Sequence, residues 1–323
     1  MHKPVFVVGI PRSGSTLWEN IIGAHPTILR LAEALFLTPW KRDIRYVLRH
    51  YANRVKTEQD VEKLVSLLFS TTELSGLKGS FWRFRGIEAV QDPQRRAQVM
   101  RRVSGRLMKT DRSEGSIFKA VVEEVTRESG FDRCCVAFPV YFNHIDKLLS
   151  WFPDCRVILA TRDPRAIAIS KTNDPSGTAL LNQRFPWLKT PIRKAMIAFV
   201  VVQYVWSAFV HAAYRNHSNY RLVRYEDLLA SPESEIRELC NFIDVAFDPS
   251  MLSPPRAMRS SITGESHGSF DPAAALRWKS KITNAELWMV TALTRRSMTT
   301  LGFDPNTHPI YREDPGDPTA TYS

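Results

Sequence analysis

VFVVGIPRSGSTLW, residues 5–18, is the stretch that decides how this chain of 323 residues folds. An apolar run typical of a buried strand leads into a segment with Gly9 and Gly14, and a helix is expected to follow at residues 15–24. Glycines at this spacing let backbone N–H groups approach an anion, and the helix N-terminus adds a favourable dipole. The pattern predicts a phosphate-binding loop.

The loop differs from those that hydrolyse nucleoside triphosphates in the position of its positive charge. Ser15 stands where such loops carry a lysine, whereas Arg12 places a cation inside the loop. Ser13, Ser15 and Thr16 add hydroxyl donors. We therefore expect the loop to hold a 5′-phosphate group rather than a pair of β- and γ-phosphates.

Short β-branched runs alternate with helical stretches along the chain. This alternation predicts an α/β fold of the P-loop NTPase type, with a central parallel sheet flanked by helices and ligands at the carboxyl ends of its strands. A mostly helical insertion is expected at about 34–133, inside a single domain of residues 1–303. Residues 304–323 are rich in Pro, Asp and Thr and are expected to form a flexible tail. The strands are predicted at 5–9, 134–138, 156–161 and 220–225.

Charge and cysteine content narrow the class of ligand. Lys and Arg exceed Asp and Glu by 44 to 33, which favours anionic ligands. The four cysteines have no zinc-ligand spacing, so we expect no metal site and buried reduced thiols in a cytoplasmic protein. The N-terminus runs straight into a strand, so no signal peptide is expected. After the strand at 156–161, Arg162 precedes Asp163, which suits an anion better than a magnesium ion.

One apolar stretch, residues 195–214, is nearly long enough to span a bilayer. Polar residues recur in it every four positions, at Gln203, Ser207, His211 and Arg215, which predicts a buried amphipathic helix rather than a membrane span. The basic segments 81–86 and 95–106 are expected to be solvated helix faces rather than nucleic-acid sites. Three tryptophans are expected in the core: Trp206, Trp278 and Trp288.

Four motifs together resemble the sulfotransferases that use 3′-phosphoadenosine 5′-phosphosulfate (PAPS). PRSGSTLW at 11–18 resembles their 5′-phosphosulfate loop, in the arginine version of tyrosylprotein and many bacterial sulfotransferases. RDPRAIAIS at 162–170 is similar to their 3′-phosphate motif. RYEDLLASPE at 224–233 resembles their Tyr-Glu-Asp element, and RWKSKI at 277–282 resembles the basic element that closes over the cofactor. The four occur in the family's order.

The resemblance implies a set of cofactor-binding residues. Arg162 leaves a strand end and Ser170 lies two helical turns further on, so both can reach one extra phosphate. The donor would be PAPS and the product adenosine 3′,5′-bisphosphate, with no metal. The implied cofactor-binding residues are Arg12, Ser13, Gly14, Ser15, Thr16, Arg162, Ser170, Tyr225 and Arg277.

Two residues are implied in catalysis. Arg12 would stabilise the negative charge that builds on the leaving oxygen. Glu33 falls where the tyrosylprotein enzymes carry their catalytic glutamate, and it would accept the proton of the acceptor hydroxyl. His267 is the alternative base, while His25 before Pro26 is expected to be structural.

One position departs from the tyrosylprotein pattern. Those enzymes carry a lysine where this chain has Ala137, so a second catalytic cation would come from elsewhere, with Lys171 and Lys279 as candidates. The acceptor is expected to be a hydroxyl, or an amine, on a small molecule, glycan or lipid. A homo-oligomer is left open. The competing functions are a small-molecule kinase with a degenerate phosphate loop and a nucleotide-binding protein without catalysis.

Overall fold

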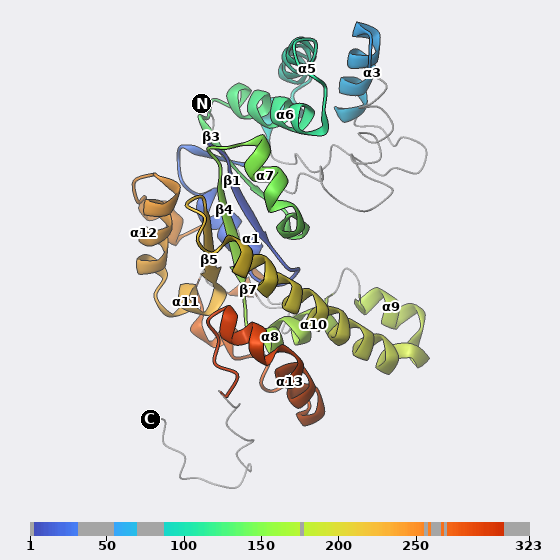
Figure 1. Ribbon diagram of the computed structural model, residues 1–323, viewed down its shortest axis with the longest axis vertical. Coiled ribbons are helices and arrows are strands. Elements are labelled where there is room, and N and C mark those ends of the chain that lie inside the picture. The colour runs from blue at the N-terminus through green and yellow to red at the C-terminus, as the bar shows by residue number, and fades with distance from the viewer. Residues whose placement is uncertain are drawn as a thin grey trace.

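The centre of the molecule is a parallel five-stranded sheet (Figure 1), as expected for an α/β fold of the P-loop type. The computed structural model describes residues 3–31, 55–69, 87–174, 178–254, 258–259, 266–267 and 270–306. The strand order is β2-β3-β1-β4-β5, so the first strand lies in the middle. The strands are β1 (Val5–Gly9), β2 (Ile28–Leu31), β3 (Arg133–Ala137), β4 (Arg156–Thr161) and β5 (Tyr220–Arg224).

Successive residues of β1 enter the two cores on either face of the sheet. Phe6 and Val8 belong to one buried cluster, and Val5 and Val7 belong to the other. Because side chains of a strand alternate between faces, an unbroken apolar run is what a strand covered on both sides requires. This arrangement brings the carboxyl ends of the neighbouring strands β1 and β4 to one edge.

Helices cover both faces of the sheet (Figure 1). The cluster with Val5 and Val7 is completed by α1 (Ser15–Ile22), α11 (Tyr225–Ala230) and α12 (Pro232–Ile243). The cluster with Phe6 and Val8 is completed by helices on the other face. Among these are α6 (Glu114–Glu128), α7 (Ile145–Trp151), α8 (Pro164–Thr172), α10 (Lys189–Tyr214) and α13 (Asn284–Thr300).

The predicted insertion is helical in its described part. It contains α3 (Glu58–Leu68), α4 (Glu88–Gln91), α5 (Pro93–Leu107) and α6. A short helix, α9 (Thr178–Arg184), precedes α10, and a hairpin pairs β6 (Met258–Arg259) with β7 (Ser266–His267). The strand β2 was not expected from the sequence. The domain limit at residue 303 stays a prediction, and most of the predicted tail lies outside the described residues.

Residues 195–214 form a helix, as predicted, but the exposed side of this helix is apolar rather than polar. The segment lies in one helix, α10, and packs against α8 and α13. Ser207 of the supposed polar stripe is buried and donates a hydrogen bond of 2.8 Å to the Tyr204 carbonyl oxygen. A hydroxyl that bonds within its own helix can be buried at little cost. By length and composition alone, residues Pro186–Tyr214 could cross a membrane.

Two of the three tryptophans expected in the core lie elsewhere. Trp278 is buried as predicted, but Trp206 is 53% exposed and Trp288 is 74% exposed. The prediction for the thiols is confirmed, because all four cysteines are buried and unpaired. Burial raises the pKa of Cys134 and of Cys155 to about 12, so these thiols are unreactive at neutral pH.

Candidate nucleotide site

The loop after β1 is packed so tightly that its two glycines are required. Gly9 has φ +152, and a Cβ there would lie 2.4 Å from the carbonyl oxygen of Ala160 on β4. Gly14 has φ +94, and a Cβ there would lie 2.7 Å from Cδ2 of Tyr225. Both contacts are closer than real Cβ atoms tolerate, and both φ values disfavour a side chain. The loop is thereby held between β4 and the start of α11.

Arg12 connects this loop to α8. Its backbone has φ +78, a conformation that costs a non-glycine residue roughly 1–2 kcal/mol. Its Nε atom donates a hydrogen bond of 2.9 Å to the Ser170 hydroxyl. Burial lowers the pKa of Arg12; Asp174 opposes this shift and Arg162 adds to it. Strained, partly buried cations are characteristic of functional sites.

Donor groups with no acceptor gather at the N-terminus of α1. Within the described part of the chain, the backbone N–H groups of Gly14, Ser15 and Thr16 have no hydrogen-bond acceptor, and no side chain caps the helix. The Ser13 hydroxyl is buried, and its Oγ lacks a partner among the described residues. A buried polar group such as the Ser13 hydroxyl costs free energy unless a ligand satisfies it. An anion at this helix end would satisfy these donors.

Arg162, at the end of β4, lies beside the same loop. It is 9% exposed, and its guanidinium lies 4.3 Å from the centroid of the Tyr225 ring. Its Nη2 atom donates to the Ala274 carbonyl oxygen at 3.1 Å, while its Nε is buried without a partner in the described structure. Among the described residues, Arg162 and Arg12 form no ion pair with a carboxylate. Two cations in this state favour a bound anion.

The second arginine of the 162–170 motif has a structural role instead. Arg165 is buried, and its Nη2 lies 2.6 Å from Oδ2 of Asp163. Its guanidinium also lies 5.0 Å from the centroid of the Trp278 ring. The Asp163 carboxylate, which in addition caps α8 by accepting the Arg165 N–H, is fully engaged. Arg165 therefore fixes the start of α8 and the position of the C-terminal segment.

The C-terminal basic element lies against the same site. Arg277 forms an ion pair with Asp271, and both residues influence the charge state of Tyr225. Burial raises the pKa of the Tyr225 hydroxyl above its ordinary value, while Arg162 and Arg277 act in the opposite direction. Tyr225 is thus enclosed by the loop, Arg162 and the 271–277 segment.

Two acidic residues near the site were not predicted. Oε1 of Glu226 accepts the Asp163 N–H at 3.0 Å, and its Oε2 is buried without a partner in the described chain. Burial raises the pKa of Glu226 to about 7. Asp174 forms an ion pair of 3.2 Å with Lys171, one of the two proposed substitute cations. Glu226 belongs to the Tyr-Glu-Asp element, so its motif was a signal that sequence reasoning left unused.

The structure describes the three residues considered as bases, Glu33, His267 and His25, to different extents. Glu33 lies outside the described residues, and for His267 the structure gives only the backbone, in β7. His25 accepts the Thr27 N–H at Nδ1, so Nε2 carries the proton and donates to the Ala246 carbonyl oxygen at 3.0 Å. His25 is therefore structural, as predicted. Ala137 is buried at the end of β3.

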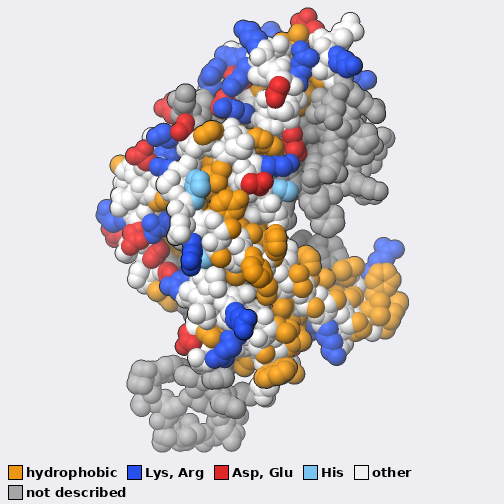
Figure 2. Space-filling view, viewed as in Figure 1, with side chains coloured by type: hydrophobic (Ala, Val, Ile, Leu, Met, Phe, Trp, Pro, Cys, Tyr) orange, Lys and Arg blue, Asp and Glu red, His pale blue; other side chains and the backbone are white. Residues whose placement is uncertain are grey.

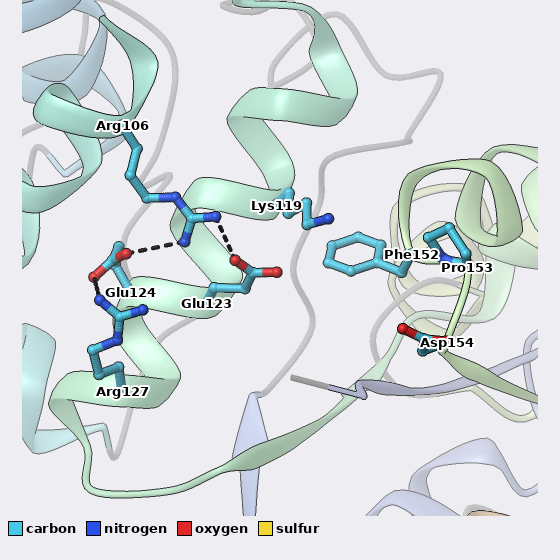
Figure 3. Close-up of a pocket in the computed structure, with 8 residues that line it drawn as sticks. All are labelled: Arg106, Lys119, Glu123, Glu124, Arg127, Phe152, Pro153 and Asp154. Carbon is cyan, nitrogen blue, oxygen red and sulfur yellow. Dashed lines mark hydrogen bonds and ion pairs between the residues drawn. The ribbon is translucent and has the colours of Figure 1, made fainter. Parts of the chain in front are cut away.

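A separate hollow of about 580 Å³ lies between α6 and the turn after α7 (Figure 3). Its charged side chains largely neutralise one another. Arg106 lies 2.5 Å from Oε2 of Glu123 and 3.0 Å from Oε1 of Glu124, and Arg127 lies 3.3 Å from Glu124. Because these cations are already paired with carboxylates, we expect this hollow to bind an anion less favourably than the loop after β1.

Comparison with known proteins identifies the family. Residues 4–249 match the model of the sulfotransferase family, so the chain belongs to that family. An uncharacterized protein of Aquifex aeolicus (strain VF5) is 21% identical over 255 residues, which are 77% of this chain. The chain spans 26% of that relative's length.

Two solved structures share the fold. One is the sulfotransferase domain of the Synechococcus PCC 7002 olefin synthase, with a TM-score of 0.57 and 18% identity over 94% of this chain and 96% of that one. The other is the sulfotransferase domain from the curacin biosynthetic pathway, with a TM-score of 0.55 and 16% identity over 94% of this chain and 99% of that one. At these identities the likeness concerns the fold.

Proposed function

We propose that this chain transfers a sulfuryl group from PAPS to a hydroxyl or amine acceptor on a small molecule, glycan or lipid. The observation that carries the proposal is the hydrogen bond of 2.9 Å between Arg12 and Ser170. It joins the loop that suits a 5′-phosphosulfate to the motif that suits a 3′-phosphate. ATP has no 3′-phosphate, so a second phosphate subsite favours PAPS as the donor. The buried thiols support a cytoplasmic location.

The residues present fit such a nucleotide. The N–H groups of Gly14, Ser15 and Thr16 and the buried Ser13 hydroxyl would hold the 5′-phosphosulfate. The residues for the 3′-phosphate would be Arg162 and Ser170, with Tyr225 and Arg277 enclosing the nucleotide.

Bound PAPS supplies a sulfuryl group whose bond to a phosphate oxygen breaks as negative charge builds on that oxygen. Arg12 stabilises this charge, because its guanidinium is fixed in place by Ser170 before the reaction begins. Glu33 accepts the proton of the acceptor hydroxyl, a role that the resemblance to the tyrosylprotein enzymes supports. His267 is the alternative base. Lys171 and Lys279 are the candidates for the cation that replaces a lysine at Ala137, and Lys171 already pairs with Asp174 at 3.2 Å.

The kinase alternative is less well supported. Ser15 replaces the lysine that contacts β- and γ-phosphates, and the Asp163 carboxylate is held by Arg165 at 2.6 Å rather than open to a magnesium ion. A nucleotide-binding protein without catalysis would use the same loop, so only a turnover measurement separates it from an enzyme.

Thermal unfolding tests the proposal first. Adenosine 3′,5′-bisphosphate without magnesium should raise the melting temperature more than ATP with magnesium does, because a ligand that binds only the folded state stabilises it. Transfer of labelled sulfate from PAPS to a panel of alcohols, phenols and amines, in the presence of EDTA, then tests turnover. Stabilisation by ATP with magnesium alone would favour the kinase. Binding without transfer to any acceptor would favour the non-catalytic alternative.

A further inference from the structure

The helix α10 presents an apolar face to solvent. Phe199, Val202, Trp206 and Phe209 follow one another at intervals of three and four residues, which places them on one side of the helix. They are between 48% and 68% exposed. The opposite side of α10, which includes Ile197, Val201 and Tyr204, is buried against the rest of the protein. A surface helix ordinarily has the reverse pattern, with polar residues outward.

This face continues onto the neighbouring helices. Figure 2 shows hydrophobic side chains gathered along α10 and reaching over α9 and α13. Contiguous exposed apolar patches on proteins mark sites of interaction. We call this surface the α10 apolar face, and its members are Leu181, Trp187, Leu188, Phe199, Val202, Trp206, Phe209, Trp288 and Leu293.

The exposed charges at the end where α9 meets α10 are positive, although three further basic residues of this segment, Arg193, Arg221 and Arg224, pair with acids. Residues 175–225 contain seven Lys and Arg and no Asp or Glu. Arg184, Lys189 and Lys194 are exposed at the end where α9 meets α10. The one acid of α13, Glu286, lies 2.6 Å from Arg193 and is thus neutralised. The surface therefore combines an apolar, tryptophan-bearing centre with a positive margin.

We propose that the α10 apolar face docks on the surface of a lipid bilayer that contains anionic lipids. Tryptophan and phenylalanine on an amphipathic helix enter the boundary between headgroups and acyl chains, and nearby Lys and Arg bind acidic headgroups. A second copy of the chain fits less well, because two-fold pairing would bring the same positive margin against itself. Since the other side of α10 is buried in the fold, the helix lies along the membrane plane. This inference is independent of the proposed reaction.

Vesicle binding by the full chain tests it. We expect binding to vesicles of phosphatidylcholine with phosphatidylserine, and weak binding to phosphatidylcholine alone. The double variant Val202→Ser/Phe209→Ser should lower the partition coefficient at least about tenfold through lost apolar contact. The double variant Lys189→Glu/Lys194→Glu should lower it by a similar factor through lost electrostatic attraction. Met108→Ser, at an apolar side chain 38% exposed after α5, is the matched control and should bind as the wild type does.

A second measurement needs no variant. Brominated lipid in the anionic vesicles should quench the tryptophan emission of the wild-type chain, because three exposed tryptophans belong to the face. Absence of both quenching and sedimentation with anionic vesicles would overturn the proposal, as would equal binding of both double variants and the wild type. If the chain instead forms a dimer that Val202→Ser/Phe209→Ser dissociates, and binds no vesicle, the face belongs to a second copy and the proposal is wrong.

Discussion

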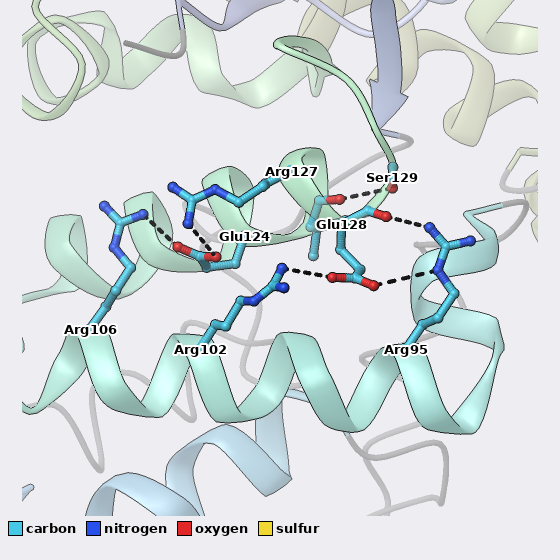
Figure 4. Close-up of polar contacts among 8 residues, drawn as sticks. Arg95, Arg102, Arg106, Glu124, Arg127, Glu128 and Ser129 are labelled. Atoms are coloured by element: carbon cyan, nitrogen blue, oxygen red, sulfur yellow. Dashed lines mark hydrogen bonds and ion pairs between the residues drawn. The ribbon is translucent and has the colours of Figure 1, made fainter.

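The arginines of α5 and the arginines at the ends of β1 and β4 have opposite surroundings. In the helical layer, Arg102 lies 2.7 Å from Glu128 and Arg106 lies 3.0 Å from Glu124, both glutamates belonging to α6 (Figure 4). In the candidate nucleotide site, Arg12 contacts a serine hydroxyl and Arg162 contacts a tyrosine ring. Arg102 and Arg106 pair with carboxylates of the protein, whereas Arg12 and Arg162 have no carboxylate partner among the described residues.

The difference separates cations that hold the fold from cations that are available to a ligand. The basic run at 95–106 was expected to be a solvated face, yet Arg95, Arg102 and Arg106 are only about one third exposed and contact α6. Their charges are used within the protein, so a basic sequence there does not indicate a binding site. Arg12 and Arg162 are fewer, but they would be stabilised by a bound anion.

Glu33 is the carboxylate that we propose as the catalytic base, and one substitution tests this role. If Glu33 is the base, Glu33→Gln should lower turnover by about 10²- to 10⁴-fold, because the amide cannot accept a proton. The affinity for adenosine 3′,5′-bisphosphate should change little. The measurement is kcat with a working acceptor beside calorimetric binding of the bisphosphate. Near-normal turnover at neutral pH would move the base to His267.

Arg12 and Arg102 test the contrast between the two groups of cations. Arg12→Ala should lower turnover by about 10²- to 10³-fold, because a fixed charge at the leaving oxygen is lost. It should also weaken nucleotide binding, since in the proposed reaction the guanidinium would contact the phosphosulfate in both ground and transition states. Arg102→Ala, which removes an arginine paired with Glu128, should leave kcat and nucleotide affinity unchanged. Equal losses of turnover in the two variants would contradict the distinction.

Glu226 should make the stability of the site region depend on pH. Burial raises its pKa to about 7 from an ordinary 4.5, so the folded chain keeps a proton that the unfolded chain has released. The free energy of unfolding should therefore fall as pH rises from about 4.5 to about 7, by on the order of 3 kcal/mol. Glu226→Gln cannot titrate and should lack this component. Urea unfolding of both proteins across this range checks it, and parallel curves would show that the carboxylate titrates normally.

Glu124 should matter for stability alone. Its side chain is 2% exposed and pairs with Arg106 and Arg127, which are 34% and 55% exposed. Glu124→Gln removes one charge from this group and should cost about 1–2 kcal/mol of unfolding free energy, less than for a fully buried pair. Nucleotide affinity should not change. The matched control is Glu233→Gln, which breaks an exposed pair with Arg237 and should cost about 0.5 kcal/mol or less in the same urea titration.

The sequence predicts the sheet and the glycine-containing turn after β1 well because local signals determine both. The apolar run before Gly9 requires a strand covered on both faces, and Gly9 and Gly14 meet the close contacts that the loop imposes. The strand β2 gives almost no such signal. It has four residues, Ile28–Leu31, and one of them is Arg30, which pairs with Glu19 of α1 at 3.0 Å.

Exposure along α10 could not be predicted, because it depends on which helices pack against it. Trp206 was expected in the core but is 53% exposed, whereas the neighbouring Ser207 is buried. The environment of Glu226 is likewise a tertiary effect, since the Asp163 N–H that it accepts comes from the turn between β4 and α8. Contacts between elements that are distant in sequence determine both the exposure of side chains along α10 and the burial of Glu226. The spacing of residues within one element does not reveal such contacts.

In the proposed function, Arg162 and Ser170 form a subsite for a second phosphate. Calorimetric titration of the wild-type chain with adenosine 3′,5′-bisphosphate and with 5′-AMP, without magnesium, tests it most directly. The bisphosphate should bind at least about tenfold more tightly, because the lost charge-assisted contacts are worth about 1.5–3 kcal/mol. Arg162→Ala should remove most of that preference. Equal affinity of the wild-type chain for the two nucleotides would contradict the claim.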